Sequence, residues 1–561
     1  MKLILKEYLS SLKERDELDA ILPDLLSELG LSVFSKPGRG TRQNGVDVAA
    51  FGSLKGSEEK VFLFSIKSGD ITRNIWDGDA LQSLRPSLNE IIDTYIPNRI
   101  PSQYKGKPIV ICICFGGDIQ EQAREQVEGY KKANSGKGFE FDEWNGDRMS
   151  ELILSSFLRE DLLPKNFQSA LRKSLALLDE PEISFKHFSH LVHLLTNTKI
   201  IKAKGIVTIA RQLNISLWIL FAWSREANNL ESAYLAGEFT ILHSWEICSP
   251  FFDRKSKDAN KIQSTFKSIQ YLYRQISLEY VKKVLPHTNK IHGLSNAINA
   301  LNRVDVNFKL FDLVGRIALN GIWSYWYFAI TSEKELKSVY EADVQLHIKL
   351  VKEIIINNPI LYSPYRDDQA IDISIVAWLL SINTMNYEDI HNWFLNLIRS
   401  IEFNFDTHSN YPCILKEYHD HINHPLKKTK EYREEITAAS ILYPTLAAFS
   451  AILNFEDIYL KIKEFEEKSL KHCNFQFWFP DETTDIHFYK NNDLHGAALS
   501  NISLEKPSKD FIDEIFKECE ANSHFENMSA FKFGLWPLIF VGCRHYRMPI
   551  PVHLIKMLKQ K

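Results

Sequence analysis

Residues 37–69 read PGRGTRQNGVDVAAFGSLKGSEEKVFLFSIKSG and decide the fold of the N-terminal part of the chain. A glycine-rich, basic loop runs into a predicted strand over 46–50. A turn then leads to a second predicted strand over 60–67. The pattern predicts a β-hairpin with Asp47 at the start of one strand and Lys67 at the end of the next.

The elements around this hairpin predict an α/β region. Apolar residues recur at helical spacing over 5–29, Gly30 is expected to end that helix, and a short strand is predicted over 31–35. The elements predicted after the hairpin are a helix over 77–95, a buried strand over 107–115, a helix over 119–133, a strand over 139–144 and a helix over 148–158. Helices and strands therefore alternate through about the first 165 residues.

The hairpin also carries chemistry. A carboxylate can hold a divalent metal that polarises a phosphate, and a nearby lysine can orient the attacking water or stabilise the developing charge. The hairpin resembles the PD-(D/E)xK restriction-endonuclease-like superfamily, in its Mrr-type form. The resemblance lies in Gly45-Val46-Asp47 and in Phe64-Ser65-Ile66-Lys67-Ser68-Gly69. The resemblance implies a nuclease domain over residues 1–165.

The resemblance also implies roles for single residues. Asp47 matches the first acid and Lys67 matches the lysine, while Glu17 on the preceding helix is the candidate for the acid that often joins them. Asp47 and Glu17 would hold Mg²⁺ or Mn²⁺. Ser65 stands where the superfamily has Glu or Gln, and a hydroxyl is a poorer ligand for a hard cation than a carboxylate. The main-chain carbonyl after Ser65 would be a further ligand.

Four residues are candidates for contacts with the substrate. Arg39 and Arg42 lie in the basic loop before Asp47, where they suit a phosphate backbone. Gln82 and Arg85 lie on the helix predicted after the lysine strand and resemble polar residues found there in the superfamily. The alternative is a solvated loop and an ordinary polar helix surface.

Composition limits the compartment and the partners. The formal net charge is −4, so any contact with DNA must come from a local patch rather than from the whole chain. Seven scattered cysteines without a CxxC pair are typical of buried free thiols in a reducing cytoplasm. Residues 436–455 carry no charge and are long enough to cross a bilayer, but they contain Pro444 and several hydroxyl residues. We expect a buried helix pair there and no membrane contact.

Residues 166–561 contain long helical patterns with few glycines and prolines. The sequence therefore predicts a large all-α region of one or two domains, with a sensor, regulatory or interaction role. A nuclease domain followed by a helical region resembles prokaryotic restriction and anti-phage defence effectors.

Three functions follow from this organisation. The first is a metal-dependent DNA endonuclease that forms a homo-oligomer or acts with an ATPase or another defence-system subunit. The second is a nuclease-like domain that has lost catalysis and binds DNA or protein, which the departure at Ser65 favours. The third is an RNA nuclease, or a helical scaffold with an incidental α/β region.

Overall fold

The computed structural model describes residues 2–36, 43–54, 56–78, 83–136, 138–156, 166–197, 203–298 and 300–560. The chain forms two compact units. The first comprises residues up to Thr240 together with Arg254–Leu272, and the second comprises Ile241–Asp253 and Tyr273–Lys561. The domain boundary that the sequence predicts near residue 165 lies inside the first unit and stays a prediction.

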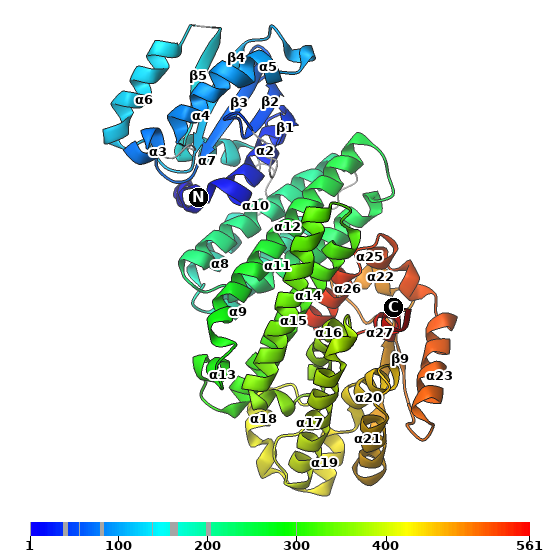
Figure 1. Cartoon of the computed structure of the whole chain (residues 1–561). Coiled ribbons are helices and arrows are strands. Elements are labelled where there is room, and N and C mark those ends of the chain that lie inside the picture. The colour runs from blue at the N-terminus through cyan, green and yellow to red at the C-terminus, as the bar shows by residue number, and fades with distance from the viewer. Residues whose placement is uncertain are drawn as a thin grey trace. The chain divides into compact units, whose positions relative to one another are not determined.

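A five-stranded mixed sheet forms the centre of the α/β region (Figure 1). Its strands, in spatial order, are β1 (Ser32–Ser35), β2 (Val48–Gly52), β3 (Lys60–Lys67), β4 (Ile109–Phe115) and β5 (Phe139–Trp144). β1, β2 and β3 are antiparallel, whereas β3, β4 and β5 are parallel. The predicted α/β region and its hairpin are confirmed.

The central position of β3 follows from its sequence. In KVFLFSIK nearly every residue is apolar, so both faces of the strand carry apolar side chains. This is typical of a strand that is covered on both sides. Leu63 and its neighbours on one face join a core with α3 (Arg73–Asp77), α4 (Leu84–Glu90) and α6 (Glu121–Asn134). On the other face Cys114 of β4 lies 3.6 Å from the sulfur of Met149 on the C-terminal helix of this region.

The remaining helices of the first unit surround this sheet or follow it. They are α1 (Lys2–Ser11), α2 (Asp19–Glu28), α5 (Ile96–Arg99), α7 (Gly146–Ser155), α8 (Phe167–Ala176), α9 (Pro181–Thr196) and α10 (Ala203–Glu226), with the π-helical turns η1 (Glu14–Leu18) and η2 (Ile91–Tyr95). The prediction of one continuous helix over 5–29 is wrong, because α1 ends at Ser11 and η1 separates it from α2. Gly30 follows α2 in a left-handed conformation, as expected of a helix end.

The second unit is largely helical. α11 (Glu231–Cys248) and α12 (Lys257–Val284) each run through the division between the units. Its other helices are α13 (Gly293–Ala297), α14 (Arg303–Ile330), α15 (Lys334–Asn357), α16 (Ala370–Leu380), α17 (Tyr387–Asp406), α18 (Tyr418–Asn423), α19 (Lys430–Ile436), α20 (Leu442–Ile452), α21 (Glu456–Ser469), α22 (Thr484–His487), α23 (Ser508–Ala521), α24 (His524–Asn527), α25 (Ser529–Lys532), α26 (Pro537–Tyr546) and α27 (Val552–Lys556).

Short strands qualify the prediction of an all-α region. β6 (Ala439–Ser440) pairs with β7 (Asn474–Phe475), and β8 (Phe477–Phe479) pairs with β9 (Ala497–Leu499). The prediction of a buried helix pair over 436–455 is wrong in part, because this stretch contains the strand β6 and one buried helix, α20, of 11 residues. Among the described residues one helix, α10, is long and apolar enough to cross a bilayer, and 83% of its most apolar window is buried, as in the core helix of a folded domain.

A tight turn places Asp47 at the start of β2. The Val46 amide donates to the Gln43 carbonyl at 3.3 Å, and both central residues, Asn44 and Gly45, have positive φ angles of 50° and 79°. This is the geometry of a type I′ turn, which Asn-Gly favours. A Cβ on Gly45 would lie 2.0 Å from the main-chain oxygen of Ser87 in α4, so only glycine lets the turn approach that helix.

Replacing Gly45 with alanine should therefore destabilise the hairpin. A left-handed conformation alone costs an alanine about 1–2 kcal/mol, and the overlap with Ser87 should bring the total loss to about 3 kcal/mol or more. Gly30→Ala is the matched control, because Gly30 has a φ of 89° and nothing within 4 Å of the added Cβ. Urea unfolding, monitored by hydrogen exchange of the β2 and β3 amides, measures the stability that each variant loses. Equal losses in Gly45→Ala and Gly30→Ala would contradict the close approach of the turn to Ser87.

Candidate functional site

Asp47 lies where β2 begins, and its side chain is held by β3. Its own amide donates to the Phe64 carbonyl at 2.8 Å, and its Oδ2 accepts the Ile66 amide at 2.7 Å. The pairing of β2 with β3 starts at Val48 and Phe64, so Ile66 lies beyond the paired part of the ladder. The carboxylate therefore satisfies an amide that β2 does not pair, and this contact fixes Asp47 next to the end of β3.

The surroundings of Asp47 make its charge costly. Burial raises the pKa of Asp47 from 3.8 to about 6. The hydrogen bond from Ile66 and the ammonium of Lys67 act in the opposite direction, and the charge of Glu14 raises the pKa further. A carboxyl group with a strongly raised pKa beside a second acid and a lysine is a common property of functional sites.

Lys67 ends β3 and is paired with Glu14. Its Nζ lies 3.1 Å from Oε1 of Glu14, and only 8% of the lysine side chain is exposed. Glu14 is the first residue of η1, and 30% of its side chain is exposed. The structure thus brings Asp47, Lys67 and Glu14 together at the end of the central strand.

Glu17, the acid that the sequence predicts for this site, has a different partner. Its carboxylate accepts two hydrogen bonds from the Arg225 guanidinium of α10, at 2.5 and 3.1 Å, and one from the Lys13 amide at 2.8 Å. The Glu17 side chain is 8% exposed. It is Glu14, three residues earlier, that contacts Lys67.

Ser65 is completely buried in β3. By the alternation of side chains along a strand it shares the face of Leu63, which packs in the core of the α/β region. Its Oγ has no hydrogen-bond partner among the described residues. A buried hydroxyl without a partner is unfavourable, so nothing in its contacts accounts for a serine at this position.

The predicted substrate-binding residues are only partly described. Arg39, Arg42 and Gln82 lie outside the described residues. Arg85 is the second residue of α4, and its Nη1 pairs with Oδ2 of Asp77 at 2.6 Å, with both side chains nearly half exposed. A role for Arg85 in substrate binding stays a prediction.

The donor set at the end of β3 fits Mg²⁺ or Mn²⁺. Among the residues that the structure describes, no group of three or more His, Cys, Asp and Glu side chains has the arrangement of a metal site. Mg²⁺, however, is commonly held by one or two carboxylates together with water and substrate phosphate oxygens. Asp47 and Glu14 are two such carboxylates, close enough that the charge of Glu14 raises the pKa of Asp47. A divalent cation would relieve that repulsion.

Two residues of this site escaped the sequence analysis. Glu14 contacts Lys67, and Arg15 is exposed and close enough to Asp47 to lower its pKa. The signal for both was a gap in the helical pattern. Buried apolar residues end at Leu12 and resume only at Leu18, and the charged run between them breaks the spacing of three and four residues.

Comparison with known proteins adds no assignment. No protein-family model, no curated protein and no solved structure matches this chain.

The raised pKa of Asp47 predicts a gain in stability when the charge is removed. A pKa higher in the folded than in the unfolded chain means that the folded state binds the proton more tightly. Stability is therefore lost as the pH rises from about 4 to about 6, and the loss persists above pH 6. Asp47→Asn in EDTA should raise the unfolding midpoint at pH 8 by about 2–4 °C, and at pH 4 by less than about 1 °C.

The control for this measurement is Asp93→Asn. Asp93 is exposed on η2, so its replacement should change the midpoint little at either pH. A midpoint of Asp47→Asn at pH 8 that equals or falls below that of the unaltered protein would show that burial does not destabilise the Asp47 charge.

Proposed function

We propose that this protein is a metal-dependent DNA endonuclease whose site lies at the end of β3. The observation that carries the proposal is the grouping of Asp47, Glu14 and Lys67 there. These are two carboxylates and one ammonium in a partly buried position, which is the set that phosphodiester hydrolysis needs. The residues are those of the resemblance to the PD-(D/E)xK superfamily, with Glu14 in the place that the sequence analysis gave to Glu17.

Each residue has a role in this proposal. Asp47 and Glu14 would hold Mg²⁺ or Mn²⁺, which when bound polarises the phosphate and neutralises its charge. Lys67 would orient the attacking water and stabilise the negative charge that develops on the phosphate oxygens. Because Lys67 is already paired with Glu14, its ammonium is held in place before substrate arrives. Arg15, exposed beside the site, would contact a flanking phosphate.

The wider setting is also part of the proposal. A nuclease region followed by a large helical region suits a cytoplasmic effector of restriction-type or anti-phage defence, with DNA as the substrate. In that setting the helical region would respond to a signal, form homo-oligomers or bind an ATPase or another subunit. All seven cysteines are free, and six are buried, which suits a reducing compartment.

A second candidate is a nuclease-like domain that binds DNA or a partner protein without cutting. One observation favours it, namely that Ser65 supplies a buried hydroxyl where the resembled superfamily has a carboxylate or an amide. Calorimetric titration with Mn²⁺ separates the two candidates, because a site that has lost its function should not bind the metal.

The endonuclease predicts metal-dependent cleavage that depends on three side chains. The full chain should nick or cut supercoiled plasmid with Mg²⁺ or Mn²⁺ and not with EDTA. Asp47→Asn, Glu14→Gln and Lys67→Ala should each slow cleavage by about 100-fold or more, since each removes a charge at the reacting phosphate. A panel of single- and double-stranded DNA and RNA then defines the substrate.

Lys60→Ala is the matched control for Lys67→Ala. Lys60 begins the same strand and pairs with Glu140 at 3.0 Å. Its loss should leave the cleavage rate within about twofold, since surface ion pairs contribute little. Cleavage that survives both Asp47→Asn and Lys67→Ala would mean that the activity comes from elsewhere.

Ser65→Ala tests whether the hydroxyl takes part. Because Oγ is buried without a partner, its removal should leave the free energy of unfolding unchanged or raise it by up to about 1 kcal/mol. The Mn²⁺ affinity and the cleavage rate should stay within about twofold. A tenfold weaker Mn²⁺ affinity, the size of effect expected when a supporting group of a metal site is lost, would instead make Ser65 part of the site.

A further inference from the structure

The turn η1 carries two acids that contact different parts of the protein. Glu14 pairs with Lys67 at the end of β3, and Glu17 pairs with Arg225 near the end of α10. The two acids are three residues apart in a five-residue turn whose π-type hydrogen bond, from the Leu18 amide to the Lys13 carbonyl, measures 3.0 Å. A displacement of one acid therefore moves the other.

Arg225 holds both ends of the connection between α1 and α2. Its guanidinium donates to both carboxylate oxygens of Glu17 and also to the main-chain oxygen of Ser11, the last residue of α1, at 3.1 Å. A bidentate arginine fixes the direction of its partner as well as its distance. The Glu17 and Arg225 side chains are 8% and 20% exposed, so this is a shielded pair rather than a surface one.

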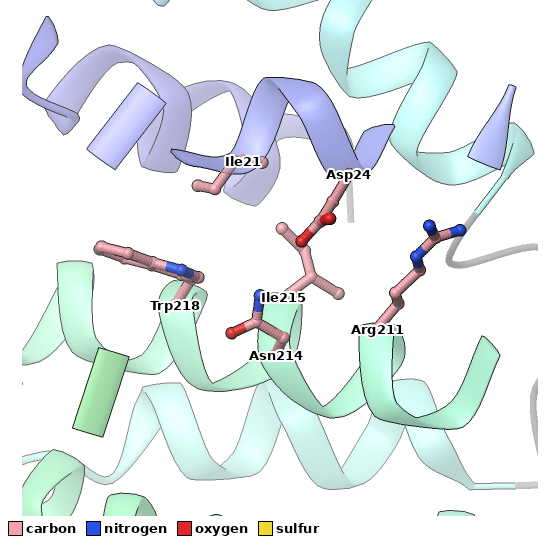
Figure 2. A pocket seen from close by; sticks show the side chains of 6 residues that line it. All are labelled: Ile21, Asp24, Arg211, Asn214, Ile215 and Trp218. Atoms are coloured by element: carbon pink, nitrogen blue, oxygen red, sulfur yellow. The ribbon is translucent and has the colours of Figure 1, made fainter. Parts of the chain in front are cut away.

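A second ion pair joins α2 and α10 away from this turn. Arg211 donates to Oε2 of Glu28 at 2.5 Å. Figure 2 shows the residues next to this ion pair: Arg211, Asn214, Ile215 and Trp218 of α10 lie opposite Ile21 and Asp24 of α2 around a cavity of about 10 Å³. Arg211 thus anchors the same two helices without touching η1, which makes it a natural control.

We propose that Arg225 is a positioning residue for the site: by fixing Glu17 it sets the place of Glu14 against Lys67, so that α10 controls the site through η1. This inference rests on the proposed nuclease site and adds its regulation. A shift of α10 that withdraws Arg225 leaves the buried Glu17 carboxylate with only Lys13, whose amide donates at 2.8 Å and whose exposed ammonium lies 3.8 Å away. A movement of η1 would relieve this loss. That movement takes Glu14 from Lys67.

The test compares Arg225→Gln with Arg211→Gln in the full chain. Arg225→Gln should weaken Mn²⁺ binding, measured by calorimetry, by about tenfold, since loss of a group that orients a ligand costs about 10–100-fold. It should lower kcat for plasmid cleavage by a similar factor and leave KM within about threefold. Arg225→Lys, which keeps a charge near Glu17, should restore part of the loss. Arg211→Gln should change neither the affinity nor kcat by more than about twofold.

A measurement that needs no activity separates this inference from the proposed function. In EDTA, Glu14→Gln should lower the unfolding midpoint of the unaltered protein and of Arg211→Gln equally. In the Arg225→Gln background the same substitution should lower it by less than half as much, because Glu14 has already left Lys67. If Arg225→Gln does not fold, Arg225→Lys takes its place, because it keeps one charge near Glu17 but loses the bidentate contact, so the effect of Glu14→Gln should be reduced in part.

The outcomes are distinct. Equal effects of Glu14→Gln in all backgrounds overturn the link between Arg225 and Glu14, whether or not the protein cuts DNA. A reduced effect in the Arg225→Gln background supports the link even if the unaltered protein neither binds Mn²⁺ nor cleaves, in which case it is the proposed function that fails. Equal losses of Mn²⁺ affinity in Arg225→Gln and Arg211→Gln would show a general loss of packing and overturn the positioning role.

Discussion

The pairing of the buried Lys67 ammonium is the constraint on which the N-terminal region depends. Lys67 ends the central strand with 8% of its side chain exposed, and a charge so placed is tolerated only beside an opposite one. Removing one partner of such a pair typically costs about 3–5 kcal/mol. The chain between α1 and α2 therefore has to pass the end of β3, so that Glu14 can pair with Lys67. This accounts for the end of the first helix at Ser11.

The strands of this region were predictable because their signals are local. The prediction of β3 over 60–67 matches its bounds, since the run of apolar residues and the flanking turns suffice to define a buried strand. Asp47 and Lys67 could be assigned to neighbouring strands for the same reason. The choice between Glu14 and Glu17 could not be made in this way. A continuous helix was assumed over 5–29, but the charged run from Lys13 to Glu17 contains no apolar residue that shows which side of the helix faces the core.

In the helical region the long helices were predictable and the short strands were not. The boundary between the strand β6 and the helix α20 illustrates the reason, because a residue far away in the sequence fixes it. Asp367 accepts hydrogen bonds from the hydroxyl of Ser440 and from the amides of Ile441 and Leu442, which lie more than 70 residues after it in the chain. Burial raises the pKa of Asp367 to about 6. No window of sequence around Ser440 contains this carboxylate, so the end of β6 and the start of α20 are tertiary features.

The π-helical form of η1 allows Glu14 and Glu17 to pair with different cations. In an α-helix, residues three apart lie on one face, so Glu14 and Glu17 would repel each other and compete for one partner. The hydrogen bond from Leu18 to Lys13 widens the turn, and the two carboxylates reach cations on different elements, Lys67 of β3 and Arg225 of α10. Such wide turns are uncommon in proteins, and those that occur often lie at functional sites. Here the irregular backbone is what allows the buried Glu17 and the partly exposed Glu14 each to pair with a cation, and it also makes the position of one dependent on that of the other.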